Sequence, residues 1–179
     1  MEEEHEKQHD SPVIRRATRN DLRQIGRLGA LLVEAHHAFD SKRFLAATSR
    51  TKDAYAAYLG TQLDAPDAAV FVAEADGDLI GYAYVAVESY DYMALRGPAG
   101  VLHDIIVDPE RRRGGVGRRL LEAALGFVLE RGLTQIVLGT AERNVAAQRF
   151  FASAGFRPTM IEMTREVQFP GARTKVRDL

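Results

Sequence analysis

The chain has 179 residues, of which 46% are hydrophobic and 27% charged, which suits one domain with a full core. Lys and Arg number 24 and Asp and Glu 25, so the net charge of -1 excludes a general attraction to nucleic acid or acidic membranes, and any anion site must be local. The absence of cysteine excludes a disulfide scaffold, a thiolate nucleophile and a zinc site built on sulfur.

The start of the chain is rich in glutamate and carries no apolar run. We therefore expect a disordered acidic tail over 1–12 rather than a targeting segment. No stretch approaches the length of a membrane span, and the cytoplasm is the expected compartment. A single domain is expected over 13–168, followed by a C-terminal tail over 169–179.

Apolar periodicity in the first third of the chain predicts one strand followed by helices. Thr18, with Asp21 three residues later, resembles a capping box at the start of the first helix. The expected elements are, in order, a strand opening at 13–14, a helix over 22–32, a loop or short helix over 36–44, and a helix over 54–63.

The rest of the chain alternates apolar runs with helical patterns. Asp76 and Gly77 separate two apolar runs, which is a strong signal for a β-hairpin. The expected strands are 70–73, 79–87, 101–107, 135–139 and 159–167, and the expected helices are 116–131 and 145–154. This order predicts one α/β domain with a mixed sheet.

Residues 107–120 combine a strand end, a loop with glycines and a helix start. The first amides of a helix lack acceptors within it, the helix dipole adds positive charge, and glycine permits close approach of a ligand. Five arginines add cations here: Arg111, Arg112, Arg113, Arg118 and Arg119. The stretch predicts a phosphate or pyrophosphate site, and the alternative is a simple turn with surface arginines. It matches neither a P-loop nor the three-glycine dinucleotide fingerprint.

Two motifs carry a family resemblance. The pattern R-x-x-G-x-G at 112–117 resembles the acetyl-CoA loop of the GNAT family of N-acetyltransferases. The pattern N-x-x-A-x-x-F-F-x-x-x-G-F at 144–156 resembles a later motif of the same family at the expected distance. The resemblance implies a single-domain GNAT-like α/β fold, with a mixed, mostly antiparallel sheet of about six or seven strands flanked by helices.

The resemblance also implies acetyl-CoA as a co-substrate, wedged between the strands 101–107 and 135–139, and no metal. Backbone groups of the first strand would bond the pantetheine arm, and amides from Arg112 to Arg118 would hold the pyrophosphate. The residues expected to bind the coenzyme are Ile105, Ile106, Val107, Arg112, Arg113, Gly114, Gly115, Val116, Gly117, Arg118, Asn144, Ala147, Phe150 and Phe151.

His103 and Asp104 are polar residues in an otherwise apolar strand, and they are the predicted catalytic pair. An alkylammonium must lose a proton before it attacks a thioester, and neutral histidine suits that task near pH 7. Some members, such as the polyamine acetyltransferases, have a Glu-Asp pair at what looks like this place. Only one of the two can face the cleft unless a bulge intervenes. The alternative is that one of them bonds neighbouring backbone.

Phe151 departs from the family pattern, because many members have tyrosine there as the acid that protonates the leaving thiolate. Arg113 stands where the family often has glycine, so its side chain must point outward. The predicted function is direct transfer of an acetyl group to a primary amine of a small molecule or peptide. The alternative, suggested by Phe151, is a CoA-binding or sensory module without catalysis.

The acceptor amine is expected between the first helices and after the hairpin, where acidic side chains could attract a cation and aromatic ones could stack on it. The residues are His36, His37, Phe39, Asp40, Tyr90 and Tyr92, and the alternative for each is ordinary packing. The expected partners are acetyl-CoA and an amine. Nucleic acid is not expected, because a basic pI is missing, nor is a membrane. The oligomeric state stays open, with a homodimer as one alternative.

Overall fold

The computed structural model describes residues 11–167. Most of the expected acidic tail, residues 1–10, and the expected C-terminal tail over 169–179 lie outside the described residues. Within them, the sheet order is β1-β2-β3-β4-β5. The strands are β1 (Val13–Arg16), β2 (Ala68–Ala75), β3 (Asp78–Glu88), β4 (Ala99–Val107) and β5 (Ile136–Leu138). Neighbours from β1 to β4 pair antiparallel, and β5 pairs parallel to β4, so the sheet is mixed and mostly antiparallel.

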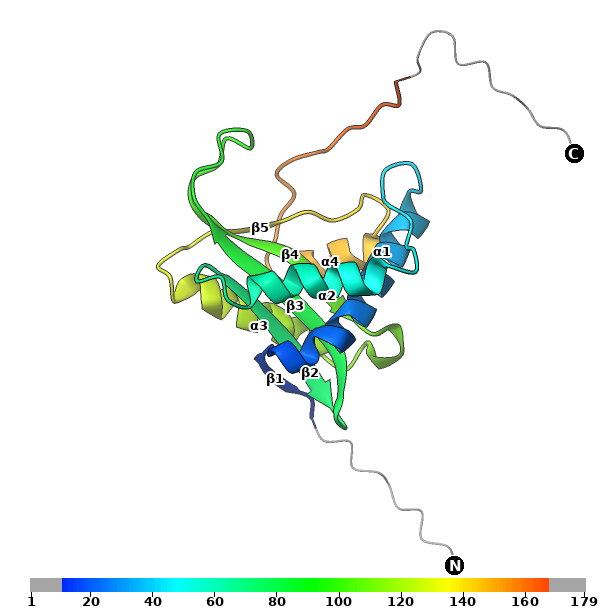
Figure 1. The fold of residues 1–179 in the computed structure, drawn as a ribbon. Coiled ribbons are helices and arrows are strands. Elements are labelled where there is room, and N and C mark those ends of the chain that lie inside the picture. Colours follow the sequence, from blue (N-terminus) through cyan, green and yellow to red (C-terminus); the bar gives the residue numbers. More distant parts are fainter. Residues whose placement is uncertain (1–10, 168–179) are drawn as a thin grey trace, which may run out of the picture.

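Helices cover both faces of this sheet (Figure 1). They are α1 (Leu22–Phe39), α2 (Thr51–Gln62), α3 (Val116–Leu129) and α4 (Val145–Ser153), with short 3-10 turns at Arg19–Asp21 and Pro109–Arg111. Alternation along β2 divides the core: Val70 and Val72 pack with α1 and α2, whereas Ala69 and Ala73 pack with α3. The α/β fold expected from the sequence is confirmed.

Two expectations about secondary structure are wrong. The loop or short helix expected over 36–44 is wrong for residues 36–39, which continue α1, and right for 40–44, which form a turn. The Nδ1 atom of His36 bonds the carbonyl of Leu32 at 2.9 Å within the helix, and that of His37 bonds the carbonyl of Phe44 at 3.0 Å in the turn. The expected strand 159–167 does not form, so the described sheet has five strands rather than six or seven. Its alternating pattern finds no paired neighbour, and Ile161 is 88% exposed.

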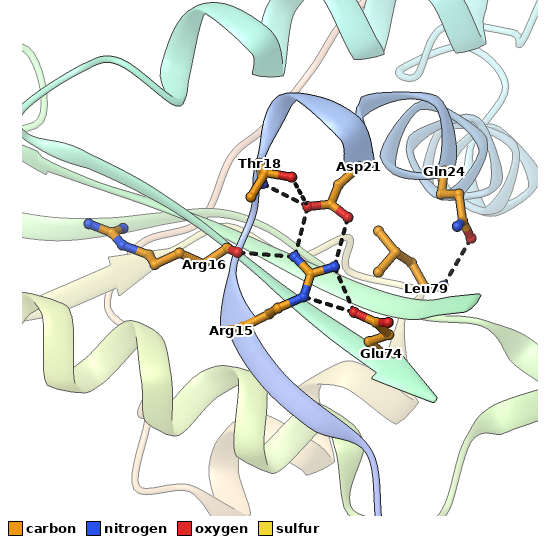
Figure 2. Close-up of polar contacts among 7 residues, drawn as sticks. All are labelled: Arg15, Arg16, Thr18, Asp21, Gln24, Glu74 and Leu79. Carbon is orange, nitrogen blue, oxygen red and sulfur yellow. Dashed lines mark hydrogen bonds and ion pairs between the residues drawn. The ribbon is translucent and has the colours of Figure 1, made fainter. Parts of the chain in front are cut away.

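A polar cluster around the buried side chain of Asp21 joins β1, the first turn and β2 (Figure 2). The Asp21 carboxylate accepts two bonds of 2.8 Å from the Arg15 guanidinium and one of 2.7 Å from the amide of Thr18. Arg15 also donates to Glu74 at 2.8 Å. The expected capping box between Thr18 and Asp21 is confirmed, and it caps the 3-10 turn that leads into α1.

The hairpin between β2 and β3 has the expected two-residue turn. Asp76 and Gly77 both have positive φ, 54° and 81°, as the right-handed twist of the flanking strands requires. Among the described residues, no helix is long and apolar enough to cross a membrane.

Candidate functional site

The predicted anion loop connects β4 to α3. Asp108 begins the loop. Its carboxylate accepts a hydrogen bond from the amide of Glu110 at 3.2 Å and forms an ion pair with Arg27 of α1 at 2.9 Å, which fixes the loop against the first helix. Arg113 and Gly115 both have positive φ, 71° and 74°. The left-handed conformation at Arg113 is one that glycine adopts without strain.

This loop leaves room for a ligand at the start of α3. A Cβ atom built on Gly114 or Gly115 would meet no atom within 4 Å. The first amides of α3, from Val116 onward, have no acceptor within the helix, and its dipole places positive charge at the same end. The residues present therefore fit a diphosphate group.

A cavity of about 860 Å³ opens beside the loop. It runs from the start of α3 and α4, along β4, to the end of α1 and to Tyr55 on α2. Every residue predicted to bind the coenzyme lines this cavity except Gly114, and so do both predicted catalytic residues. Of the predicted acceptor residues, His36 and Phe39 line it.

Four predicted acceptor residues lie elsewhere. The His37 ring bonds the Phe44 carbonyl, and the Asp40 carboxylate accepts backbone amides of the following turn at 3.0 and 3.3 Å. Tyr90 and Tyr92 stack on each other, 6.4 Å between ring centroids, beside a separate shallow hollow after β3. The structure thus corrects their placement, because local bonds and ring stacking engage these side chains away from the main cavity.

A bulge places both predicted catalytic residues on one face of β4. Tyr84 pairs with Asp104, but Val85 pairs with Leu102, so His103 is the extra residue in the ladder. His103 stacks on the ring of Tyr84, 4.7 Å between centroids, and Tyr84 and Asp104 lie opposite each other across the two strands. The side chains of His103 and Asp104 consequently face the same side of the sheet, toward α1 and α2.

The Asp104 carboxylate is held by two tyrosines. Its oxygens accept the hydroxyl of Tyr82 at 3.0 Å and that of Tyr55 at 3.4 Å. Burial raises the pKa of Asp104 above its ordinary value, although the tyrosine hydrogen bonds oppose that rise. Burial, together with the neighbouring carboxylate, also raises the pKa of both tyrosines. The hydroxyls therefore stay protonated as donors, and each carboxylate oxygen keeps accepting capacity.

Glu88 orients the imidazole of His103. Its Nε2 lies 3.3 Å from an Oε1 of Glu88, and the other Glu88 oxygen accepts from Arg96 at 2.7 Å. When Nε2 carries the proton toward Glu88, Nδ1 is the nitrogen with the free lone pair.

The later motif forms α4. Asn144 caps this helix, because its Oδ1 accepts the amide of Ala147 at 3.1 Å, which leaves the side-chain NH₂ for a ligand. Phe151 is buried between Phe150 and Phe156, with centroid distances of 5.1 and 5.5 Å. It supplies apolar surface to the cavity and no proton.

Sequence reasoning missed four residues that support the pair: Tyr55, Tyr82, Tyr84 and Glu88. Tyr82 and Tyr84 lie at alternate positions of β3, and this spacing was the one sequence signal for these supporting residues. Tyr55 left no such signal, because it reaches Asp104 from a helix 49 residues away in the chain. Gly29 makes that reach possible, because a Cβ there would lie 2.2 Å from Cδ1 of Tyr55. The close approach of α1 and α2 therefore sets the tyrosine hydroxyl beside the carboxylate.

Comparison with known proteins identifies relatives of this architecture. The chain is 31% identical to an uncharacterized N-acetyltransferase of Archaeoglobus fulgidus over 144 residues, 80% of this chain and 92% of the relative. It is 40% identical over 89 residues to the mycothiol acetyltransferase of Thermobispora bispora, matching half of this chain but only 30% of the relative's length.

The fold is shared with solved acetyltransferases. Aminoglycoside N-acetyltransferase AAC(6')-Iy, solved in complex with CoA, superposes with a TM-score of 0.67 at 23% identity, covering 88% of this chain and 95% of that one. The model of the acetyltransferase (GNAT) family matches residues 32–156, which include both motifs and the whole of β4. Together with the long match to the archaeal relative, this shows that the chain belongs to the GNAT family of acetyltransferases.

Proposed function

We propose that this protein transfers an acetyl group from acetyl-CoA directly to a primary amine of a small molecule or peptide. The observation that carries the proposal is that the anion loop and the His103–Asp104 pair line one cavity. Relatives named as mycothiol and aminoglycoside acetyltransferases support the reaction class. The acyl donor and the acceptor would thus meet along β4.

The loop would hold the coenzyme by its diphosphate. The amides at the start of α3 bind phosphate oxygens, and the cations of Arg112, Arg113 and Arg118 line the same end of the cavity. The side-chain NH₂ of Asn144 is available to the coenzyme. When bound, acetyl-CoA supplies an acyl group on a thioester, whose C–S bond breaks as the C–N bond forms and whose sulfur leaves with the electron pair.

His103 would act as the base and Asp104 as the group that attracts the ammonium. The proton lost by the amine nitrogen passes to the imidazole, which Tyr84 and Glu88 hold in place. Phe151 offers no proton to the leaving thiolate. A thiolate with a pKa near that of cysteine, about 8.5, leaves without an acid, so phenylalanine at this position is compatible with transfer.

The test is release of free CoA thiol from acetyl-CoA in the presence of a panel of amines. The proposal predicts amine-dependent release, and a fall in kcat of about 100-fold or more in the His103→Gln variant. The Asp67→Asn variant, which changes an exposed carboxylate outside the cavity, should keep the activity of the parent. Tight CoA binding without thiol release for any amine would instead favour a CoA-binding module, the function that Phe151 suggests.

A further inference from the structure

The cavity continues past Asp104 into an apolar end that the coenzyme loop does not reach. Its wall comes from the last turns of α1, the following segment and α2. Most of its residues are apolar or aromatic, namely Leu32, Val33, Phe39, Phe44, Leu45 and Tyr55, and His36 and Arg43 also contribute to it. We propose, on the basis of the proposed function, that the acceptor is a monoamine, with one ammonium group on an apolar or aromatic body.

The wall is continuous with the acidic group that would receive the ammonium. Tyr55 belongs to the wall and donates its hydroxyl to Asp104 at 3.4 Å. The ring of His36 packs edge-on against Phe44 and Phe39, at centroid distances of 5.1 and 6.2 Å. An amine whose nitrogen lies at Asp104 would therefore place its next carbons against aromatic and aliphatic surface.

Within residues 11–167, Asp104 is the only carboxylate that lines the cavity. Its two oxygens accept one tyrosine hydroxyl each, which leaves room for an ammonium hydrogen bond. The other charged residues along the lining are arginines, and Arg43 lies on the wall itself, with its guanidinium 5.1 Å from the ring centroid of Phe44. A second ammonium group on the acceptor would meet apolar surface or a cation.

Four carboxylates outside the lining have partners of their own. Asp40 and Asp91 accept backbone amides of their own turns. Glu88 is shared between His103 and Arg96, and Glu162 binds Arg43. Transferring an unpaired charge to an apolar surface is costly, so the arrangement disfavours polycationic acceptors. The proposed acceptor pocket therefore differs from the acidic cleft that the sequence predicted around Asp40 and the loop after β3.

The first experiment compares heptylamine with 1,6-diaminohexane, two chains of matched length that differ by a methyl or a second ammonium at the far end. Binding of each is measured by calorimetry with and without CoA, and turnover by thiol release from acetyl-CoA. We expect heptylamine to bind at least about ten-fold more tightly and to show the higher kcat/KM. Kanamycin, a polycation, should bind more weakly still.

The second experiment adds a carboxylate to the wall. Leu45 is 84% exposed and lines the cavity, so Leu45→Glu should fold normally, and Leu45→Gln is its uncharged match. The glutamate variant should improve binding of 1,6-diaminohexane relative to heptylamine by about three-fold, and the glutamine variant should not.

The outcomes separate this inference from the proposed function. Preferential binding of heptylamine without any turnover supports the acceptor class and refutes the transfer reaction. Turnover that favours the diamine or kanamycin, with matching affinities, supports the transfer reaction and overturns the inference. Equal affinity of the two matched amines also overturns it.

Discussion

The ion pair between Arg15 and Asp21 should contribute measurably to stability. The Arg15 guanidinium beside Asp21 lowers the pKa of that carboxyl from its ordinary value of 3.8 to about 2, and the residue is 7% exposed. One pKa step corresponds to about 1.4 kcal/mol, so the ionised carboxylate stabilises the fold by about 2 kcal/mol at pH 7. Asp21→Asn should lower the free energy of unfolding by about that amount.

The pH dependence follows from the direction of the shift. A carboxyl whose folded pKa is lowered stabilises the protein above the unfolded pKa, and that stability is lost as the pH falls from about 4 through about 2. Urea unfolding at pH 7 and at pH 2 should therefore show a large difference between parent and variant at the first pH and a small one at the second. Asp64→Asn is the control, because Asp64 pairs with Arg19 but both side chains are exposed, and it should cost less than about 1 kcal/mol. If Asp21→Asn lowered the free energy of unfolding as little as the control does, or by the same amount at pH 2 as at pH 7, the ionised Asp21 would not stabilise the fold in this way.

Two further predictions concern the groups that hold His103 and Asp104, the predicted catalytic pair. Gly29→Ala places a Cβ against the Tyr55 ring, so it should lower the free energy of unfolding by about 1–3 kcal/mol, as measured by thermal unfolding. In steady-state kinetics it should raise KM for the amine more than KM for acetyl-CoA. An unchanged free energy of unfolding together with an unchanged KM for the amine would contradict this prediction. Glu88→Leu removes the acceptor of the His103 Nε2 proton, so ¹⁵N NMR should show a mixture of imidazole tautomers where the parent shows one protonated at Nε2; a single tautomer in both proteins would contradict it.

The predicted coenzyme loop was accessible to sequence reasoning because its chemistry is local. The loop 107–118 is one continuous segment, and the backbone amides that face a ligand follow from glycine positions and a helix start. The structure adds that Arg113 takes a left-handed conformation, which glycine adopts without strain.

The proposed acceptor end of the cavity could not be predicted in the same way, because long-range contacts build it. Whether His103 and Asp104 share a face depends on a one-residue bulge, which an alternating pattern does not reveal. Tyr55 comes from a separate helix whose position depends on Gly29. The side chains of Asp40 and Tyr90 looked suitable by residue type, but local bonds in one case and an exposed loop in the other keep them out of the cavity.

The expected strand over 159–167 shows the same limit. Its alternation of apolar and polar residues is typical of a strand, but a strand also needs a neighbour to pair with. Met160 and Met163 are 73% and 90% exposed, so the apolar side chains of this segment do not pack into the core of the described chain.

Calorimetric titration with CoA is the direct test of whether the amides at the start of α3 bind the diphosphate of the coenzyme, as we propose. Gly117 lines the cavity, and its Cβ position is 3.7 Å from both Phe150 and Val107, so Gly117→Val fills the space beside the amides. Gly126→Ala changes a glycine of the same helix outside the cavity, with no atom within 4 Å of its Cβ position. We predict that Gly117→Val weakens CoA binding by at least about ten-fold while Gly126→Ala leaves the Kd unchanged. If a folded Gly117→Val variant bound CoA with the Kd of the parent, the diphosphate would not bind at these amides.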